Sequence, residues 1–322
     1  MKGRKHNMEN NKQITSNDEI VVSKERLSQL ISEIEKFELT DEEKKKYSGS
    51  YIKLPAGETH YEMKGEGEAV VLVHGYATPY YIYDRIFDFL VEKGYKVIRY
   101  DLLGRGFSER VPGYYTPDLF ASQLEQLTDA LIPDGKFFLF GTSMGGAVVT
   151  AFAAKRPERV RKLFLLAPAG MEYKTPLYMK LANKPLIGEL MFKALGGRLL
   201  LTRSCAELIY SKEQTGYYLE KFAEGARYKG FLRATLSSLR NTLMKPEVTV
   251  ANYKKVAQKN IPVCTIWGTA DKTMPYYQSK QLSSIFPDMH LYTFEGSGHI
   301  FLFDEGERTC GIIINEMTGE NE

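Results

Sequence analysis

The stretch from residue 136 to residue 146 constrains the fold of this 322-residue chain more than any other. It begins with a short apolar run, rich in phenylalanine, that is typical of a buried strand. The run ends at Gly141, Thr142, Ser143, Met144 and Gly145, which fit the pattern G-x-S-x-G, and a helical stretch follows over 147–155. Glycines on both sides of the serine let the backbones of strand and helix approach closely. We therefore predict a tight strand-to-helix turn that exposes the hydroxyl of Ser143.

Strands alternate with helices along most of the chain. Apolar runs predict strands at 69–73, 96–100, 160–167, 261–268 and 289–294, helical patterns occur at 83–93, 117–132, 278–286 and 304–317, and an alternating segment at 51–67 predicts a hairpin. Such alternation requires right-handed crossovers and predicts a mostly parallel central sheet flanked by helices. Ligands of such sheets bind beyond the carboxyl ends of the strands. We therefore expect Ser143, His74 and Asp101, which all follow strand ends, to lie on one rim.

The alternation stops between about residues 170 and 250. Helical patterns alone occur there, at 177–181, 187–195, 204–210, 216–228 and 231–243. We predict a helical cap over 171–250, inserted into a core formed by 48–170 and 251–322. The cap segment carries 13 Lys and Arg residues against 7 Asp and Glu residues. A solvated basic surface is the preferred interpretation of this excess, and attraction of an acidic substrate or an acidic carrier protein is the alternative.

The N-terminal region divides into two parts. Residues 1–20 are polar without apolar periodicity, which predicts a disordered tail. In residues 21–47, apolar side chains recur at helical spacing with charges between them, which predicts an amphipathic helix; they are Leu27, Leu30, Ile31, Ile34 and Phe37. We expect this helix to pack on the main domain, with membrane-surface docking and dimerisation as the alternatives.

Composition excludes several classes of protein. The formal net charge of +3 supports no nucleic-acid partner. Cys205, Cys264 and Cys310 are far apart and odd in number, which argues against a disulfide framework or a zinc site and suits the cytoplasm. No apolar run approaches the roughly 18 residues of a membrane span, and the N-terminus lacks the apolar core of a signal peptide. The glycines at 65 and 67 fall short of a dinucleotide pattern, so we expect no cofactor and no metal.

A serine hydroxyl is a weak nucleophile and needs a base within hydrogen-bond reach. Of the five histidines, His299 alone is predicted on a loop that follows the last strand. The others are placed in the tail (His6), within strands (His60, His290) and in the turn before the first crossover helix (His74). We therefore predict that His299 takes the proton of Ser143. The imidazole in turn needs an acid to hold its tautomer, and Asp271 directly follows the penultimate strand.

The chain order Ser143, Asp271, His299, together with the motif at 141–145, resembles that of the α/β-hydrolase fold family. The resemblance covers about residues 50–317 and includes His74-Gly75 and the turn at 101–108. It implies that Ser143 is the nucleophile, His299 the base and Asp271 the acid of a catalytic triad. Some relatives place the acid after the strand that follows the nucleophile helix, where Glu172 is the nearest carboxyl group. We prefer Asp271.

The resemblance also implies an oxyanion hole made of two backbone N–H groups. One is that of Met144, and the other belongs to the loop after His74, where we prefer Tyr76 to Ala77. Nearby tyrosines could line an acyl pocket, although packing beneath the cap is the commoner role for such side chains; they are Tyr80, Tyr81 and Tyr83.

Serine at position 143 argues against the dehalogenase and epoxide hydrolase branches, which use aspartate there. The cap resembles those of monoacylglycerol lipases, small-molecule esterases and carbon–carbon bond hydrolases. We expect a serine hydrolase that cleaves small-molecule carboxylic esters with an apolar acyl group through an acyl-enzyme. A carbon–carbon bond hydrolase, a thioesterase and a non-catalytic ligand-binding protein of this fold are the alternatives, because one fold hosts many chemistries.

Overall fold

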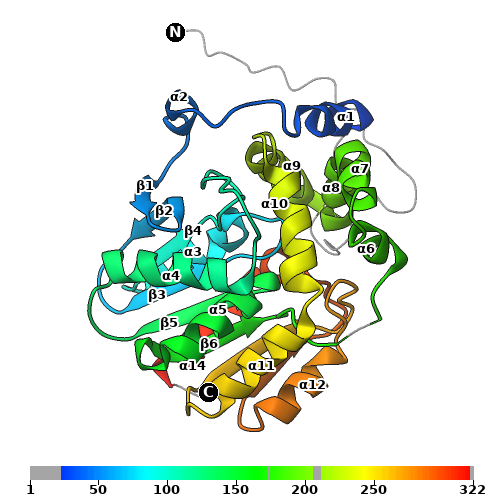
Figure 1. Ribbon diagram of the computed structural model, residues 1–322. Coiled ribbons are helices and arrows are strands. Elements are labelled where there is room, and N and C mark those ends of the chain that lie inside the picture. The colour runs from blue at the N-terminus through cyan, green and yellow to red at the C-terminus, as the bar shows by residue number, and fades with distance from the viewer. Residues whose placement is uncertain (1–22, 173, 206–211, 320–322) are drawn as a thin grey trace, which may run out of the picture.

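An eight-stranded sheet forms the centre of the molecule (Figure 1). It is described by a computed structural model that covers residues 23–172, 174–205 and 212–319. The predicted tail at 1–20 and most of the predicted helix at 204–210 lie outside these residues. The strand order is β1-β2-β4-β3-β5-β6-β7-β8. Pairing is antiparallel between β1 (Ser50–Leu54), β2 (Gly57–Lys64) and β4 (Lys96–Tyr100), and parallel through the rest of the sheet. The prediction of a mostly parallel sheet is confirmed.

The central strands are buried on both faces, as their unbroken apolar sequences require. They are β3 (Ala69–Val73), β5 (Phe137–Thr142), β6 (Val160–Leu166) and β7 (Val263–Gly268), and β8 (His290–Phe294) closes the sheet. The register places Val73 opposite Gly141 and Gly141 opposite Leu165, so the carboxyl ends of these strands reach the same level. The loops that follow the strands therefore meet at one edge.

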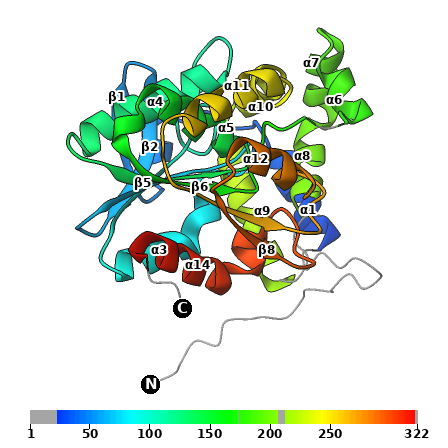
Figure 2. The ribbon, with the colours of Figure 1, turned by 90° about the horizontal axis from the view of Figure 1, so that it is seen from below.

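Helices cover both faces of the sheet (Figure 2). One face carries α3 (Asp84–Glu92) and α14 (Gly306–Thr318). The other carries α4 (Pro117–Leu131), α5 (Met144–Lys155), α11 (Pro246–Ala257) and α12 (Gln278–Ile285). Short helical turns lie at η1 (Tyr80–Tyr83), η2 (Pro157–Arg159) and α13 (Phe301–Asp304). We did not predict α11, which begins inside the segment assigned to the cap and packs on α5.

The described part of the segment between β6 and α11 consists of helices, which lie beyond the carboxyl edge of the sheet (Figure 1). They are α6 (Leu177–Ala182), α7 (Ile187–Met191), α8 (Gly197–Cys205), α9 (Lys212–Ala226) and α10 (Phe231–Ser238). Two π-helical segments, η3 (Phe192–Gly196) and η4 (Leu239–Leu243), continue α7 and α10. The cap boundaries at 171 and 250 remain a prediction.

The prediction of one amphipathic helix over 21–47 is wrong. The segment forms α1 (Lys24–Glu33) and a short α2 (Asp41–Lys44), separated by an extended stretch. In that stretch Phe37 exchanges backbone hydrogen bonds with the end of α9, donating to the Arg227 carbonyl at 3.0 Å and accepting from the Lys229 N–H at 2.9 Å. Glu35 takes a positive φ of 56°, which a continuing helix excludes. Pairing with a distant segment therefore outweighs the local helical pattern.

Candidate active site

Ser143 occupies a strained turn between β5 and α5. Its φ of 52° and ψ of −122° lie outside the regions that a residue with a Cβ ordinarily occupies. Three hydrogen bonds hold the residue there. Its N–H donates to the Leu166 carbonyl at 2.9 Å, and its carbonyl accepts from the N–H groups of Gly146 at 2.9 Å and Ala169 at 2.8 Å. The tight turn predicted from the sequence is therefore present, and it is held on both sides by the backbone.

Two glycines allow this turn to form beside β3. A Cβ at Gly145 would lie 2.3 Å from the carbonyl oxygen of Val73, a distance that no side chain tolerates. A Cβ at Gly75 would lie 3.1 Å from the Cβ of Ser143. The loop after β3 thus approaches the serine closely because Gly145 lacks a side chain, whereas a Cβ at Gly75 would require its neighbour to shift by a few tenths of an ångström.

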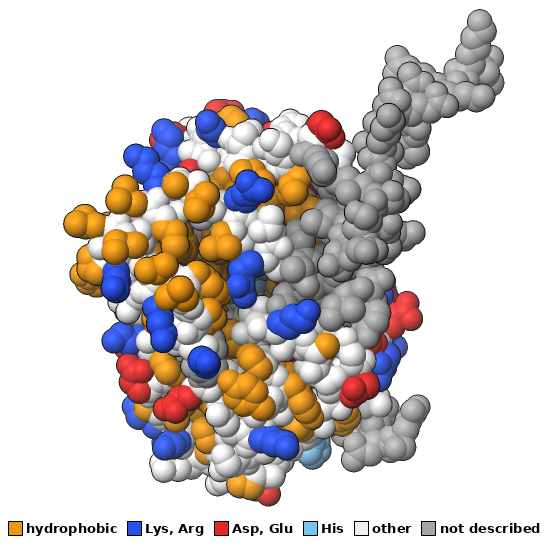
Figure 3. All heavy atoms as spheres, turned by 90° about the vertical axis from the view of Figure 1, so that its right-hand side faces the viewer, with side chains coloured by type: hydrophobic (Ala, Val, Ile, Leu, Met, Phe, Trp, Pro, Cys, Tyr) orange, Lys and Arg blue, Asp and Glu red, His pale blue; other side chains and the backbone are white. Residues whose placement is uncertain are grey.

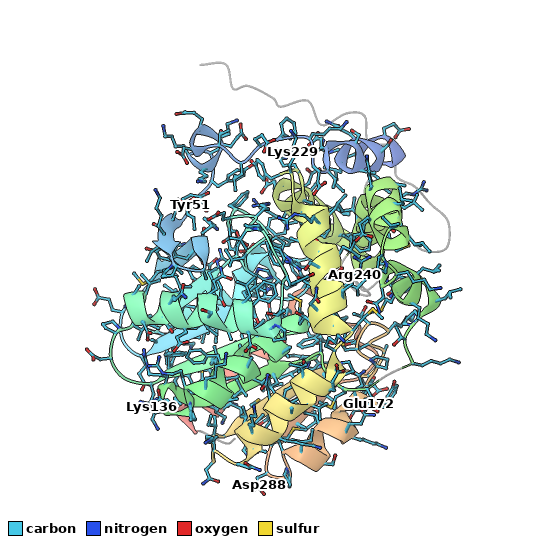
Figure 4. The ribbon with its side chains drawn as sticks, viewed as in Figure 1. Tyr51, Lys136, Glu172, Lys229, Arg240 and Asp288 are labelled. Carbon is cyan, nitrogen blue, oxygen red and sulfur yellow. The ribbon has the colours of Figure 1, made fainter. Side chains whose placement is uncertain are left out.

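His299 and Asp271 meet on the loops that follow β8 and β7. The His299 Nδ1 lies 2.7 Å from Oδ2 of Asp271. Oδ1 of the same carboxylate accepts the backbone N–H groups of Thr273 at 2.9 Å and Met274 at 2.7 Å. The Asp271 side chain is fully buried, so these bonds leave Oδ2 directed at the imidazole. Glu172, the alternative acid, is exposed near the edge of the molecule (Figure 4).

Ser143 and His299 line one cavity of about 430 Å³ between the rim of the sheet and the cap helices. Most of its wall is apolar, with side chains that include Ile82, Met179, Phe192, Leu200 and Leu239. Three basic residues, Lys174, Arg203 and Lys272, also line it, and the described lining residues include no Asp or Glu. None of Tyr80, Tyr81 and Tyr83 lies on this wall. The Tyr83 hydroxyl donates to the Val73 carbonyl at 3.0 Å, so this tyrosine packs beneath the loop.

The residues proposed for the oxyanion hole lie on both sides of Ser143. Met144 is the first residue of α5, where a helix leaves its N–H groups without intrahelical partners and carries partial positive charge. Gly75, Tyr76 and Ala77 line the cavity beside the serine. The side chain of Tyr76 is anchored to the cap, since its hydroxyl donates to the Thr235 carbonyl in α10 at 3.0 Å.

Arg105, whose role sequence reasoning missed, anchors the backbone of Tyr76. Its Nε donates to the Tyr76 carbonyl at 2.9 Å and its Nη1 to the Leu103 carbonyl at 3.3 Å. The guanidinium is fully buried and its Nη2 has no hydrogen-bond partner among the described residues. Burial without a neighbouring carboxylate lowers the pKa of Arg105 to about 10. The sequence signal was an arginine between two glycines after Asp101, which we interpreted only as part of a turn.

Asp101 and His74, which were predicted to lie on the same rim as Ser143, hold the loops of that rim in place. Asp101 accepts the N–H of Phe107 at 2.9 Å, and its Oδ2 lies 2.9 Å from Nδ1 of His60. Burial raises the pKa of Asp101, but the bond and charge of His60, with smaller effects of His74 and the Phe107 N–H, together outweigh it and hold that pKa below its usual value. The Nε2 of His74 accepts the Leu102 N–H at 2.9 Å, and burial lowers the pKa of His74 to about 4. His74 is therefore neutral at pH 7.

Within 23–172, 174–205 and 212–319, no group of three or more His, Cys, Asp or Glu side chains is arranged to hold a metal ion. No helix in the same residues is long and apolar enough to cross a membrane.

The fold and the serine turn define the class of protein. The model of the alpha/beta hydrolase fold family matches residues 68–306, so the chain belongs to the α/β-hydrolase fold family. Among curated proteins it is 28% identical over 250 residues to Lipase 3 of Moraxella sp., covering 73% of this chain and 72% of that one. It is 27% identical over 274 residues to a 2-hydroxy-6-oxononadienedioate/2-hydroxy-6-oxononatrienedioate hydrolase of Klebsiella pneumoniae, covering 80% and 89%. An esterase from Exiguobacterium antarcticum has a similar structure, with a TM-score of 0.71, 18% identity, and coverage of 84% of this chain and all of that one.

Proposed function

We propose that the protein is a serine hydrolase that cleaves carboxylic esters with an apolar acyl group. One observation carries the proposal. The 2.7 Å contact between His299 and a fully buried Asp271 lies beside a strained serine on the wall of a mostly apolar cavity. This arrangement supplies a nucleophile, a base and a group that orients the base, which together define acyl transfer to serine.

Each residue then has one task in the reaction. Nε2 of His299 takes the proton of Ser143 as the hydroxyl attacks the ester carbonyl, and returns it to the leaving alcohol. Asp271 accepts the Nδ1–H, which holds the tautomer and stabilises the imidazolium. Water activated by His299 then attacks the acyl-enzyme and releases the acid. The N–H groups of Met144 and Tyr76 stabilise the oxyanion, and losing one such donor typically costs about 100- to 1,000-fold in turnover.

A carbon–carbon bond hydrolase is the second candidate. The cations on the cavity wall favour it, because Lys174, Arg203 and Lys272 would attract a substrate that carries carboxylates. The Klebsiella relative is named for a dioate, a substrate with two carboxylates. The mostly apolar wall and the similarity to Lipase 3 favour the ester.

Hydrolysis of p-nitrophenyl esters from acetate to palmitate tests the proposal. We expect Ser143→Ala to lose about 10⁴-fold or more of the wild-type kcat, because no other group replaces the nucleophile. Ser284→Ala is the matched control, since this serine is exposed on α12 and should leave activity unchanged. Full esterase activity in a folded Ser143→Ala protein would refute the assignment of the nucleophile. Cleavage of a vinylogous diketone acid, with no ester cleaved, would favour the second candidate.

A further inference from the structure

The outer face of the cap exposes an unusual number of large apolar side chains. We call them the apolar ridge; they are Leu177, Leu181, Leu186, Ile187, Leu190 and Leu195, from α6, the following turn, α7 and η3. They make up half of the exposed large hydrophobic side chains in the described part of the chain. Figure 3 shows a broad hydrophobic area, dotted with Lys and Arg, on this side of the molecule. Contiguous apolar surface of this kind marks an interaction site in a protein that is stable in water.

The segment that carries the ridge is held in place by packing and hydrogen bonds. The inner side of the same segment packs in a cluster of its own, which includes Met179 and Phe192. Arg240 in η4 donates to the carbonyls of Ala182 at 2.9 Å and Lys184 at 3.0 Å and forms an ion pair with Glu189 (Figure 4). The apolar side chains are therefore exposed on an anchored element.

Leu186 is the most exposed member of the ridge. It has a φ of 64°, which is unfavourable for a leucine, and 77% of its surface is exposed. The isolated protein gains little packing from the side chain of this strained residue. A partner that covers the side chain would supply the missing contact.

Positive charge surrounds the ridge. Between residues 174 and 203 the chain has six basic side chains, all exposed; they are Lys174, Lys180, Lys184, Lys193, Arg198 and Arg203. The single acid in that range, Glu189, is paired with Arg240. None of the six basic residues forms an ion pair with another described residue.

We propose that the apolar ridge and its basic rim dock onto an anionic phospholipid bilayer. Leucine side chains enter the boundary between headgroups and acyl chains while lysines contact the phosphates. The bilayer thus covers the apolar ridge and neutralises its basic rim at the same time. A second copy of this chain fits less well, because a two-fold interface would bring the two basic rims together. An acidic protein would pair with the rim but would leave the leucines without an apolar environment.

Docking would also place the cavity beside the lipid. Lys174, Pro176 and Tyr178 line the cavity and lie at the start of the segment that carries the ridge. An ester dissolved in the bilayer would then have a short path to Ser143. This consequence rests on the proposed function, whereas docking itself does not.

Co-sedimentation of the full chain with vesicles tests the proposal. The probes are vesicles of phosphatidylcholine alone and of phosphatidylcholine with about 30% phosphatidylserine, a content chosen to give the anionic surface of a cytoplasmic leaflet. We expect binding to the anionic vesicles that falls at least about tenfold in 0.5 M NaCl, because salt screens the basic rim. The double variant Leu186→Ser/Leu190→Ser should lose binding by a similar factor, as should Lys180→Gln/Lys184→Gln. None of these four residues lines the cavity.

Matched controls separate docking from loss of the fold. Met63→Ser removes an exposed hydrophobic side chain from β2, and Lys45→Gln/Lys46→Gln removes the two lysines that follow α2; both should bind as wild type does. Unchanged thermal melting and p-nitrophenyl acetate hydrolysis would show that the ridge variants are folded. Equal binding by ridge and control variants would overturn the proposal, as would no binding to anionic vesicles at 50 mM NaCl. A dimer in solution that Leu186→Ser/Leu190→Ser dissociates, without vesicle binding, would assign the surface to a second copy instead.

Discussion

Arg105 is a buried cation whose contacts suit it to hold a peptide in place. Its Nε bond to the Tyr76 carbonyl fixes the plane of the peptide that joins Tyr76 to Ala77. The Tyr76 N–H belongs to the preceding peptide, so Arg105 holds this donor through the backbone of Tyr76 itself. Oxyanion stabilisation depends on donors that are already placed before charge develops, so a small displacement of Tyr76 would weaken it. Arginine suits the task because its planar fork bonds two carbonyls at once, which the single ammonium of lysine does less well.

We therefore predict that Arg105→Lys lowers kcat about 10- to 100-fold while KM changes little, the pattern of an interaction made in the transition state. Arg110→Lys is the matched control. Arg110 is partly buried and also binds carbonyls, those of Ser108 at 2.6 Å, Gly106 at 2.7 Å and Gly225 at 3.0 Å, but it has no hydrogen bond to Tyr76. Steady-state kinetics on one ester would measure both variants. Equal losses of kcat would show that Arg105 only supports the fold.

The two histidines behind the serine respond to pH in opposite directions. Burial lowers the pKa of His60, but the hydrogen bond and charge of Asp101 outweigh it and raise that pKa above its usual value. The stability that His60 contributes is complete below its unfolded pKa and is lost as pH rises through the folded value. The pKa of His74 is lowered to about 4, so its contribution is complete above about pH 6.5 and is lost as pH falls.

We predict that protonation of His74 costs about 2 kcal/mol of the free energy of unfolding between pH 7 and pH 5, from the difference between pKa values of about 6.5 and about 4. Urea unfolding at both pH values would measure it in the wild type and in His74→Gln. The variant starts less stable but lacks this titration, so its stability should fall by about 2 kcal/mol less. Carboxylates titrate in both proteins and cancel in the comparison. Identical losses would contradict the assignment.

Contacts with the cap helices hold the N-terminal helix α1 in place. Leu30 in α1 is fully buried, and Arg26 binds Glu220 in α9 with an Nε–Oε1 distance of 2.6 Å. The ion pair is partly exposed and contributes little. Burial of Leu30 is the larger effect, because removing such a side chain typically costs about 2–5 kcal/mol.

We predict that Leu30→Ala loosens α1 and α9 locally. Hydrogen exchange followed by mass spectrometry should show faster exchange in both helices and unchanged exchange in β5 and β7, because α1 packs mainly on α8 and α9. Leu27→Ala, a partly buried neighbour on the same helix, should have a smaller effect. Faster exchange across the whole sheet would mean that α1 unfolds only together with the rest of the molecule.

Elements with a strong local sequence pattern were predicted accurately, and an element with a weak pattern was missed. The strands from β3 to β8 are largely apolar runs, and their predicted positions agree with the structure within a few residues. The helix α11 was missed because its sequence is rich in β-branched residues and its apolar stripe is weak. It is held by tertiary contacts such as the hydrogen bond from the Tyr253 hydroxyl to the Ala169 carbonyl at 2.7 Å.

At the scale of the whole molecule, the sheet domain and the cap helices together form the wall of the cavity. Gly75, Ser143 and Ile300 line it from the loops of the sheet, whereas Met179 and Leu239 line it from the cap side. An apolar ligand that fills the space would contact both parts. Binding would then stabilise the position of the cap, because burial of apolar surface on both sides is lost when they separate.

We predict that a long-chain phosphonate attached to Ser143 slows hydrogen exchange in α6 and α10 several-fold more than a short-chain phosphonate does. Dodecyl and ethyl p-nitrophenyl phosphonates would form the two adducts, and mass spectrometry would measure exchange. The strands β3 and β5 serve as the internal control, since they are buried in both adducts. Equal protection of α6 and α10 by the two chains would show that the acyl group does not reach the cap.

The sequence alone determined the sheet, the turn at Ser143 and the places of Asp271 and His299. All three depend on local patterns: apolar runs form strands, and the strand ends of a parallel sheet lie on one rim. Tertiary structure decided what depends on residues far apart in the chain. The pairing of Phe37 with Arg227 divides the N-terminal helix, Arg105 reaches back to Tyr76, and packing on η4 turns the leucines of the ridge outward. Such contacts leave no periodic signal, because each joins segments whose approach is set only when the whole chain packs.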